Sequence, residues 1–179
     1  RHLAERIQMQ QAAGHSFDLL VIQLDADITL SSYETANIGM VGDAHDRLPS
    51  YDESQNIAEN CEHLKQIVLT DWIGQENRIP GLVWCIPYIN IDLWVAYWLY
   101  ENDRGILAES MSNDELVRLL LQKGKDEGRL LSRKQGRIKK RPSVYKVAMQ
   151  KLSVALWQNM TQNFVQAKAF DLELCNSMV

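Results

Sequence analysis

The chain contains short runs of consecutive apolar residues and longer stretches in which apolar residues recur every three or four positions. The first run, Leu-Leu-Val-Ile-Gln-Leu within residues 18–25, leads into Asp25-Ala-Asp27. A second run spans residues 81–86 and stops at Pro87. Runs of this length between polar residues predict fully buried strands of a parallel sheet, and proline is not expected inside such a strand.

The stretches with helical spacing are bounded by residues that cap helices. Asp52 or Ser54 can cap a helix that runs to about Ile73, and Asn90 can cap a short helix that reaches Tyr100. The segment 28–51 is rich in Gly, Ser and Asp and predicts an extended loop. Helices are predicted over residues 2–13, 52–73, 91–100, 116–121, 142–158 and 163–174.

Two of these helices have specific start signals. Ser112 and Glu115 have the spacing of a capping box. Pro142 suits the first position of a long helix that reaches Gln158 or beyond. The order of strands and helices predicts an α/β fold, in which helices flank a small parallel-rich sheet and a helical C-terminal part follows.

Length and composition narrow the class of protein. The 179 residues suit one domain with a small appendage, and an apolar fraction of 46% is ordinary for a globular protein. Three cysteines without a Cys-x-x-Cys pattern favour a reduced, cytoplasmic setting. No stretch approaches the roughly 20 uninterrupted apolar residues of a membrane span. The sequence has no P-loop and no Gly-x-Ser-x-Gly elbow, which disfavours a nucleotide-driven motor and a common serine hydrolase.

Three aspartates follow the two predicted strands. Asp25 and Asp27 have the i, i+2 spacing that places both side chains on one side of a strand. Asp92 falls in the first turn of the helix after the second strand, where its simplest role is an interaction with the helix dipole. The carboxyl ends of parallel strands meet at one edge of a sheet. A hard cation there would neutralise the clustered charges, so the three aspartates predict a site for Mg²⁺ or Mn²⁺.

The net charge of −4 conceals a strong asymmetry. Residues 1–117 carry 6 Lys and Arg against 19 Asp and Glu, whereas residues 118–146 carry 11 against 2. The basic block predicts contact with nucleic-acid phosphates, and the alternative is a solvated basic loop. The predicted nucleic-acid-binding residues are Lys123, Lys125, Arg129, Arg133, Lys134, Arg137, Lys139, Lys140 and Arg141.

Four aromatic residues lie on the second strand and on the helix that follows it. They are Trp84, Trp94, Tyr97 and Trp98. Aromatic side chains at such positions can stack on nucleic-acid bases, but on a strand and a short helix they more often form core. We therefore predict that these four residues are buried.

The segments Asp25-Ala-Asp27-Ile and Pro-Tyr-Ile-Asn-Ile-Asp92-Leu-Trp94 resemble TOPRIM-like proteins of bacterial anti-phage systems, such as the RloB-type and AriB-type nucleases. In that family, a DxD pair ends one strand. A later turn with a proline leads into a helix that starts with an acidic residue and a Trp. Residues 139–145 and 169–174 are also similar in style to the closing helices of the family.

The resemblance spans most of the chain and implies its organisation and activity. Residues 1–110 would form a TOPRIM-like core and residues 111–179 a helical C-terminal part. Asp25, Asp27 and Asp92 would bind the metal and act in catalysis. The protein would be a metal-dependent nuclease that cleaves RNA or DNA as the toxic effector of an antiviral defence system.

The sequence departs from the family pattern in two places. TOPRIM domains carry a Glu on a strand before the first helix, and this chain begins within that helix. Either the strand lies upstream of residue 1, as we expect, or the site is incomplete. Asp92 also stands where Glu is more usual. Two alternatives therefore stay open: a non-catalytic TOPRIM-like module that docks on a partner ATPase and senses nucleic acid, and a plain α/β scaffold with a basic flank. The resemblance implies an ATPase partner, and a homo-oligomer stays open. The lack of a long apolar stretch predicts that the protein has no membrane partner.

Overall fold

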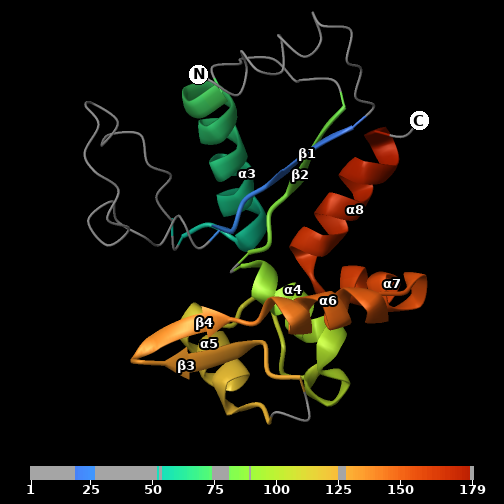
Figure 1. The fold of residues 1–179 in the computed structure, drawn as a ribbon. Coiled ribbons are helices and arrows are strands. Elements are labelled where there is room, and N and C mark those ends of the chain that lie inside the picture. The colour runs from blue at the N-terminus through green and yellow to red at the C-terminus, as the bar shows by residue number, and fades with distance from the viewer. Residues whose placement is uncertain are drawn as a thin grey trace, which may run out of the picture. The chain divides into compact units, whose positions relative to one another are not determined.

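The computed structural model describes residues 19–26, 52, 54–73, 81–88, 90–124 and 128–177. These segments contain both helices and short strands, so the prediction of a mixed α/β protein is confirmed (Figure 1). None of the helices in the described segments is long and apolar enough to cross a membrane. The predicted helix 2–13, the predicted loop 28–51, Asp27 and Lys125 lie outside the described residues.

The contacts within the chain define two compact units. One consists of residues 1–86 together with 169–179, and the other of residues 87–168. The boundaries of these two units do not show where a TOPRIM-like core would end. The predicted organisation, with a core over 1–110 and a helical part over 111–179, therefore stays a prediction.

The first unit contains a pair of parallel strands, as predicted. Strand β1 (Leu20–Gln23) pairs with β2 (Leu82–Cys85) in a register that sets Gln23 opposite Cys85. All four positions of β2 are buried. The predicted full burial of β1 is wrong, because its positions alternate between half-buried and exposed and Val21 is 45% exposed. Successive side chains of a strand point to opposite faces, so β1 buries one face and leaves the other uncovered.

Helix α3 (Ile57–Ile67) starts later than the sequence predicts. Its cap is Asn56, which forms a capping box with Glu59, and neither Asp52 nor Ser54 caps it. The Asp52 carboxylate instead accepts hydrogen bonds from the backbone and the hydroxyl of Ser54, at 2.9 and 2.6 Å. This local turn competes with helix formation at its own residues. After α3 the chain continues as the π-helix η3 (Val68–Ile73).

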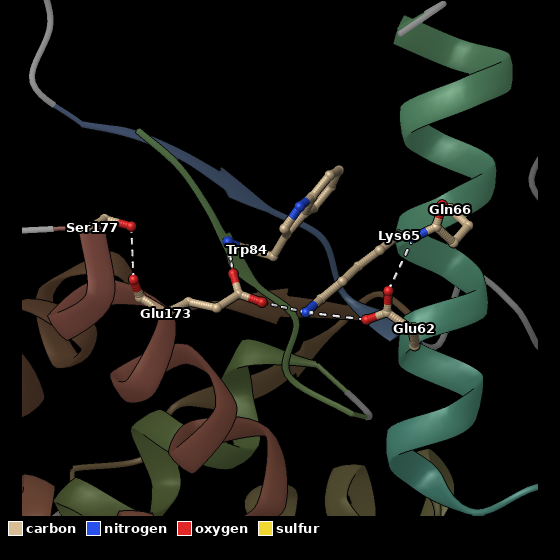
Figure 2. Close-up of polar contacts among 6 residues, drawn as sticks. All are labelled: Glu62, Lys65, Gln66, Trp84, Glu173 and Ser177. Atoms are coloured by element: carbon tan, nitrogen blue, oxygen red, sulfur yellow. Dashed lines mark hydrogen bonds and ion pairs between the residues drawn. The ribbon is translucent and has the colours of Figure 1, made fainter. Parts of the chain in front are cut away.

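Glu173 bonds to the edge of β2 that faces away from β1. It lies in the part of α8 (Val165–Ser177) that belongs to the first unit. One of its carboxylate oxygens accepts a hydrogen bond from the backbone N–H of Trp84 at 2.8 Å, and the other pairs with Lys65 of α3 at 2.5 Å (Figure 2). An unpaired strand edge is open to other strands, and here a side chain occupies one of its donors.

The core of the second unit is built around helix α4 (Ile91–Leu99). Asn90 caps this helix as predicted, and every residue of the helix after Ile91 is buried. Trp94, Tyr97 and Trp98 are at most 5% exposed, and Trp84 of the first unit is also buried, so the prediction that the four aromatics are core is confirmed.

Helices around α4 carry further caps. Helix α5 (Asn113–Gln122) begins with the predicted capping box of Ser112 and Glu115. A single 3-10 turn, η4 (Glu101–Asp103), follows α4. The predicted long helix from Pro142 is wrong in its length. The chain forms α6 (Pro142–Lys151) and then α7 (Val154–Asn163), because extended backbone at Leu152 and Ser153 interrupts it and Ser153 caps the second helix.

The basic block contains a β-hairpin that the sequence analysis did not predict. Strands β3 (Leu131–Lys134) and β4 (Arg137–Lys140) pair in antiparallel fashion. The two residues between them, Gln135 and Gly136, have φ values of +53° and +76°. Positive φ at both positions is what a type I′ turn requires, and this turn matches the twist of the strands it joins.

Candidate functional site

Asp25 lies two residues after the carboxyl end of β1, the end at which functional groups of parallel sheets gather. The backbone N–H of Leu24 still bonds to the carbonyl of Cys85, at 3.0 Å, so the chain is held to β2 up to the residue before Asp25. The Gln23 side-chain amide donates to Asp25 Oδ1 at 2.6 Å, and Asp25 is half-buried. A carboxylate is therefore fixed at this end of the parallel pair.

The thiol of Cys85, at the end of β2, has a pKa that depends on its burial and in part on the charge of Asp25. Burial, and secondly the negative charge of Asp25, raise the pKa of the Cys85 thiol to about 11. The thiol is therefore protonated at neutral pH and is a poor nucleophile. Cys85 is a buried residue of β2 beside the candidate site.

The predicted partner of Asp25, Asp27, lies outside the described residues. Within the described segments, no three His, Cys, Asp or Glu side chains gather closely enough to hold a metal ion. Asp25 belongs to the first unit and Asp92 to the second. The convergence of the three carboxylates on one cation therefore stays a prediction.

Asp92 is a buried carboxylate with two strong polar partners. Its backbone N–H donates to the capping side chain of Asn90, and its Oδ1 accepts hydrogen bonds from Tyr145 Oη at 2.6 Å and Lys140 Nζ at 3.1 Å. Asp92 is 5% exposed, whereas the Lys140 side chain is 56% exposed. The contacts tie the start of α4 to β4 and α6, which gives Asp92 a structural role beyond the predicted interaction with the helix dipole.

One carboxylate oxygen of Asp92 is left without a donor among the described residues. Both donors reach Oδ1, and among the described residues no donor reaches Oδ2. An oriented carboxylate with one uncommitted oxygen can accept a further hydrogen bond or bind a cation. Tyr145 could not be identified from the sequence, because nothing in the local sequence links it to a residue 53 positions earlier.

The structure separates the predicted nucleic-acid-binding residues by their contacts. Lys123 pairs with Asp103 and lies 5.1 Å from the centre of the Tyr100 ring. Arg129 Nε donates to the carbonyl of Lys123 at 2.6 Å. With Lys140 bound to Asp92, three of the predicted residues hold the second unit together.

The other described basic residues lie on or beside the hairpin. Arg133, Lys134, Arg137 and Lys139 are exposed, and Arg141 is half-buried at the start of α6. None of these five has a carboxylate within 4.0 Å in the described part of the chain. Their charges are therefore available to a partner.

Glu109 is a buried carboxylate that the sequence analysis missed. It accepts hydrogen bonds from the backbone N–H groups of Val165 and Gln166 at 2.7 and 3.0 Å, and so caps the start of α8. Burial raises the pKa of Glu109 to about 7, against the opposing effect of these backbone hydrogen bonds. The cap comes from a residue far away in the sequence, so no local capping motif could reveal it.

Comparison with known proteins adds no relative. The chain matches no protein-family model, no curated protein and no solved structure.

Proposed function

We propose that this chain is a divalent-metal-dependent nuclease of the TOPRIM-like type, which cleaves phosphodiester bonds of RNA or DNA as the effector of an anti-phage defence system. The observation that carries the proposal is the position of Asp25. Its carboxylate is held at the carboxyl end of two parallel strands, one of them fully buried. This is the position where the DxD pair of the resembling proteins binds metal.

The donor set fits Mg²⁺ or Mn²⁺. Both ions prefer carboxylate and water oxygens. In the proposal, Asp25 and Asp27 hold the ion, and Asp92 would be a further ligand or would orient a water molecule bound to it, as the resemblance implies. A bound divalent cation would polarise a phosphoryl oxygen and favour ionisation of a water molecule. The basic residues of the hairpin would neutralise substrate phosphates and position the backbone without reading its sequence.

One observation favours a second candidate function. Tyr145 and Lys140 both donate hydrogen bonds to Asp92, and a purely structural role of Asp92 would account for these two bonds. If Asp92 serves only to hold β4 and α6, the chain fits the non-catalytic alternative, a module that docks on a partner ATPase and contacts nucleic acid.

A cleavage assay separates the two candidates. The substrates are tRNA, single-stranded DNA and duplex DNA, each with Mg²⁺, with Mn²⁺ or with EDTA. The proposal predicts cleavage that requires the metal and is lost in the Asp25→Asn/Asp27→Asn variant. Absence of cleavage under all conditions, with the protein folded, would contradict the nuclease and favour the docking module.

A further inference from the structure

The register of the β3–β4 hairpin sorts its cations onto two faces. Directly paired residues of antiparallel strands lie on the same face, as do residues two positions apart. Lys134 pairs with Arg137, and Ser132 pairs with Lys139. These four residues form one face, which we call the basic face. The other face consists of Leu131, Arg133, Ile138 and Lys140.

The second face anchors the hairpin. Leu131 is 2% exposed, and Lys140 donates to Asp92. Next to the strands, the backbone N–H of Arg141 bonds to the carbonyl of the fully buried Leu130, at 3.0 Å. The base of the hairpin is therefore fixed to the core of the second unit through one face. The cations of the basic face are exposed to solvent.

The charges of the basic face are left uncompensated. Like charges directly opposite each other destabilise an antiparallel pair, and Lys134 faces Arg137 in this way. Lys139 lies two residues from Arg137 on the same strand, at a spacing of about 7 Å. Within the described residues, no carboxylate reaches any of the three cations. A polyanion would remove this repulsion, and a fixed row of cations is suited to successive negative charges.

The chemistry of the basic face selects among polyanions. Membrane-surface binding combines cations with apolar side chains that enter the lipid, and this face has none, because Ile138 lies on the opposite face. Binding of single strands combines cations with aromatic side chains on which bases stack, and this face has no aromatic residue. A double helix hides its bases and presents its phosphates outward. A two-stranded β-ribbon also fits the major groove of B-DNA.

We infer that the basic face of the β3–β4 hairpin binds the phosphate backbone of a double-helical nucleic acid through Lys134, Arg137 and Lys139. The choice of nucleic acid as the polyanion rests on the proposed function. The inference narrows the nine predicted binding residues to three. Lys123, Arg129 and Lys140 are engaged in contacts within the protein. Arg133 lies on the opposite face, Arg141 lies outside the strands at the start of α6, and Lys125 lies outside the described residues.

Binding in EDTA tests the inference without any contribution from cleavage. Fluorescence anisotropy of a short labelled duplex, as DNA and as RNA, is measured over a salt series. Three phosphate contacts contribute about −2.7 to the slope of log K against log salt for B-DNA. The variant Lys134→Gln/Arg137→Gln/Lys139→Gln is expected to lose that part of the slope. At the lowest salt, the variant should bind the duplex at least 40-fold more weakly than the wild-type protein. This factor is roughly the loss of affinity that a slope of −2.7 gives for a fourfold rise in salt.

A matched variant controls for the loss of charge. Lys146→Gln/Lys151→Gln/Lys168→Gln removes the same number of positive charges from exposed helical positions and is expected to retain most of the binding. Equal loss of binding in both variants would overturn the inference. Binding of a single strand of the same sequence as tightly as the duplex would also overturn it. A third result would also overturn it: the three substitutions weaken binding to anionic phospholipid vesicles but do not weaken binding to the duplex.

The outcomes separate this inference from the nuclease proposal. Duplex binding that depends on the basic face, without any metal-dependent cleavage, would leave the inference standing and remove the nuclease. Cleavage that requires Asp25 and Asp27, with duplex binding that the three substitutions leave unchanged, would support the nuclease and overturn the inference.

Discussion

Lys134 and Arg137 face each other directly across the β3–β4 hairpin, on either side of its two-residue turn. The two cations lie on the same face, and no carboxylate in the described part of the chain reaches either of them. Cross-strand pairs of opposite charge stabilise a hairpin and pairs of like charge destabilise it. The hairpin therefore carries a local electrostatic cost that a bound polyanion would offset.

Substitution of Lys134 by Glu converts this pair into one of opposite charge. Thermal unfolding should show a gain in stability of about 0.2–1 kcal/mol. The same variant should bind duplex nucleic acid more weakly in anisotropy measurements, because one attractive contact becomes repulsive. A variant that is both more stable and a weaker binder fits the account. A loss of stability would show that Lys134 has a structural partner.

The turn of the hairpin offers a stability test that does not involve charge. Gln135 has a φ of +53°, a region that costs a residue other than Gly, Asn or Asp roughly 1–2 kcal/mol. Gln135→Asn should therefore stabilise the protein by several tenths of a kcal/mol to about 1 kcal/mol in chemical denaturation.

Gly136→Ala is the matched control for that substitution. A Cβ at Gly136 would meet no atom within 4 Å, so the expected loss of about 1 kcal/mol comes from the backbone conformation alone. If both variants leave the free energy of unfolding unchanged, the hairpin does not form this turn in solution.

The stability of the fold should depend on a hydrogen-bond acceptor at position 92, and the oxygen of an amide should serve in place of the carboxylate. Asp92→Ala removes the hydrogen bonds that Asp92 accepts from Tyr145 and Lys140 and should cost about 1.5–3 kcal/mol. Asp92→Asn keeps a carbonyl oxygen at this position and should cost less. Tyr145→Phe removes only the hydroxyl and should cost about 1 kcal/mol. Chemical denaturation gives all three values, and equal losses for Asn and Ala would contradict the acceptor role.

The same Asp92→Asn variant reports on metal binding. An amide is a poorer ligand for Mg²⁺ than a carboxylate. Retained folding with lost cleavage is the expected result if Asp92 acts in the proposed site. Unchanged cleavage would restrict Asp92 to its structural contacts.

Glu109 should make stability depend on pH between its two pKa values. Its pKa is about 7 in the folded protein and 4.5 as its ordinary value, so the folded state binds more protons in this interval. Stability from this group is fully present below about pH 4.5 and is lost as the pH rises to about 7, by roughly 3 kcal/mol. Glu109→Gln should remove this slope from the free energy of unfolding. A slope that persists in the variant would assign it to another group.

Some elements of the fold could be predicted because their causes are local. The capping box of Ser112 and Glu115, the cap at Asn90 and the buried strand β2 each follow from a few adjacent residues. Local signals failed where two of them compete. Asp52 and Ser54 resemble caps but bond to each other, and Ser153 interrupts a stretch that has helical spacing throughout.

The hairpin was missed because its strands do not alternate between apolar and polar residues. Arg137, Ile138, Lys139 and Lys140 are all exposed, so neither face is apolar along its length. The Gln-Gly pair at the turn was the available signal, but it is weaker than Asn-Gly. What holds the hairpin is the buried Leu131 and the contact between Lys140 and Asp92.

The candidate site shows the same division. The position of Asp25 after β1 follows from the run of apolar residues that precedes it. The partners of Asp92 lie 48 and 53 residues further along the chain. Contacts over such separations depend on tertiary packing, which no local pattern encodes.

The most direct test of the proposed metal site is divalent-ion binding by the wild-type protein and by Asp25→Asn/Asp27→Asn. Isothermal titration with Mn²⁺ and Mg²⁺ gives the affinity, and thermal unfolding in metal-free buffer gives the stability. The account predicts that the variant loses ion binding and unfolds at the same or a higher temperature, because a repulsive pair of carboxylates has been removed. Ion binding unchanged in the variant, or a variant that fails to fold, would contradict a metal site at this aspartate pair.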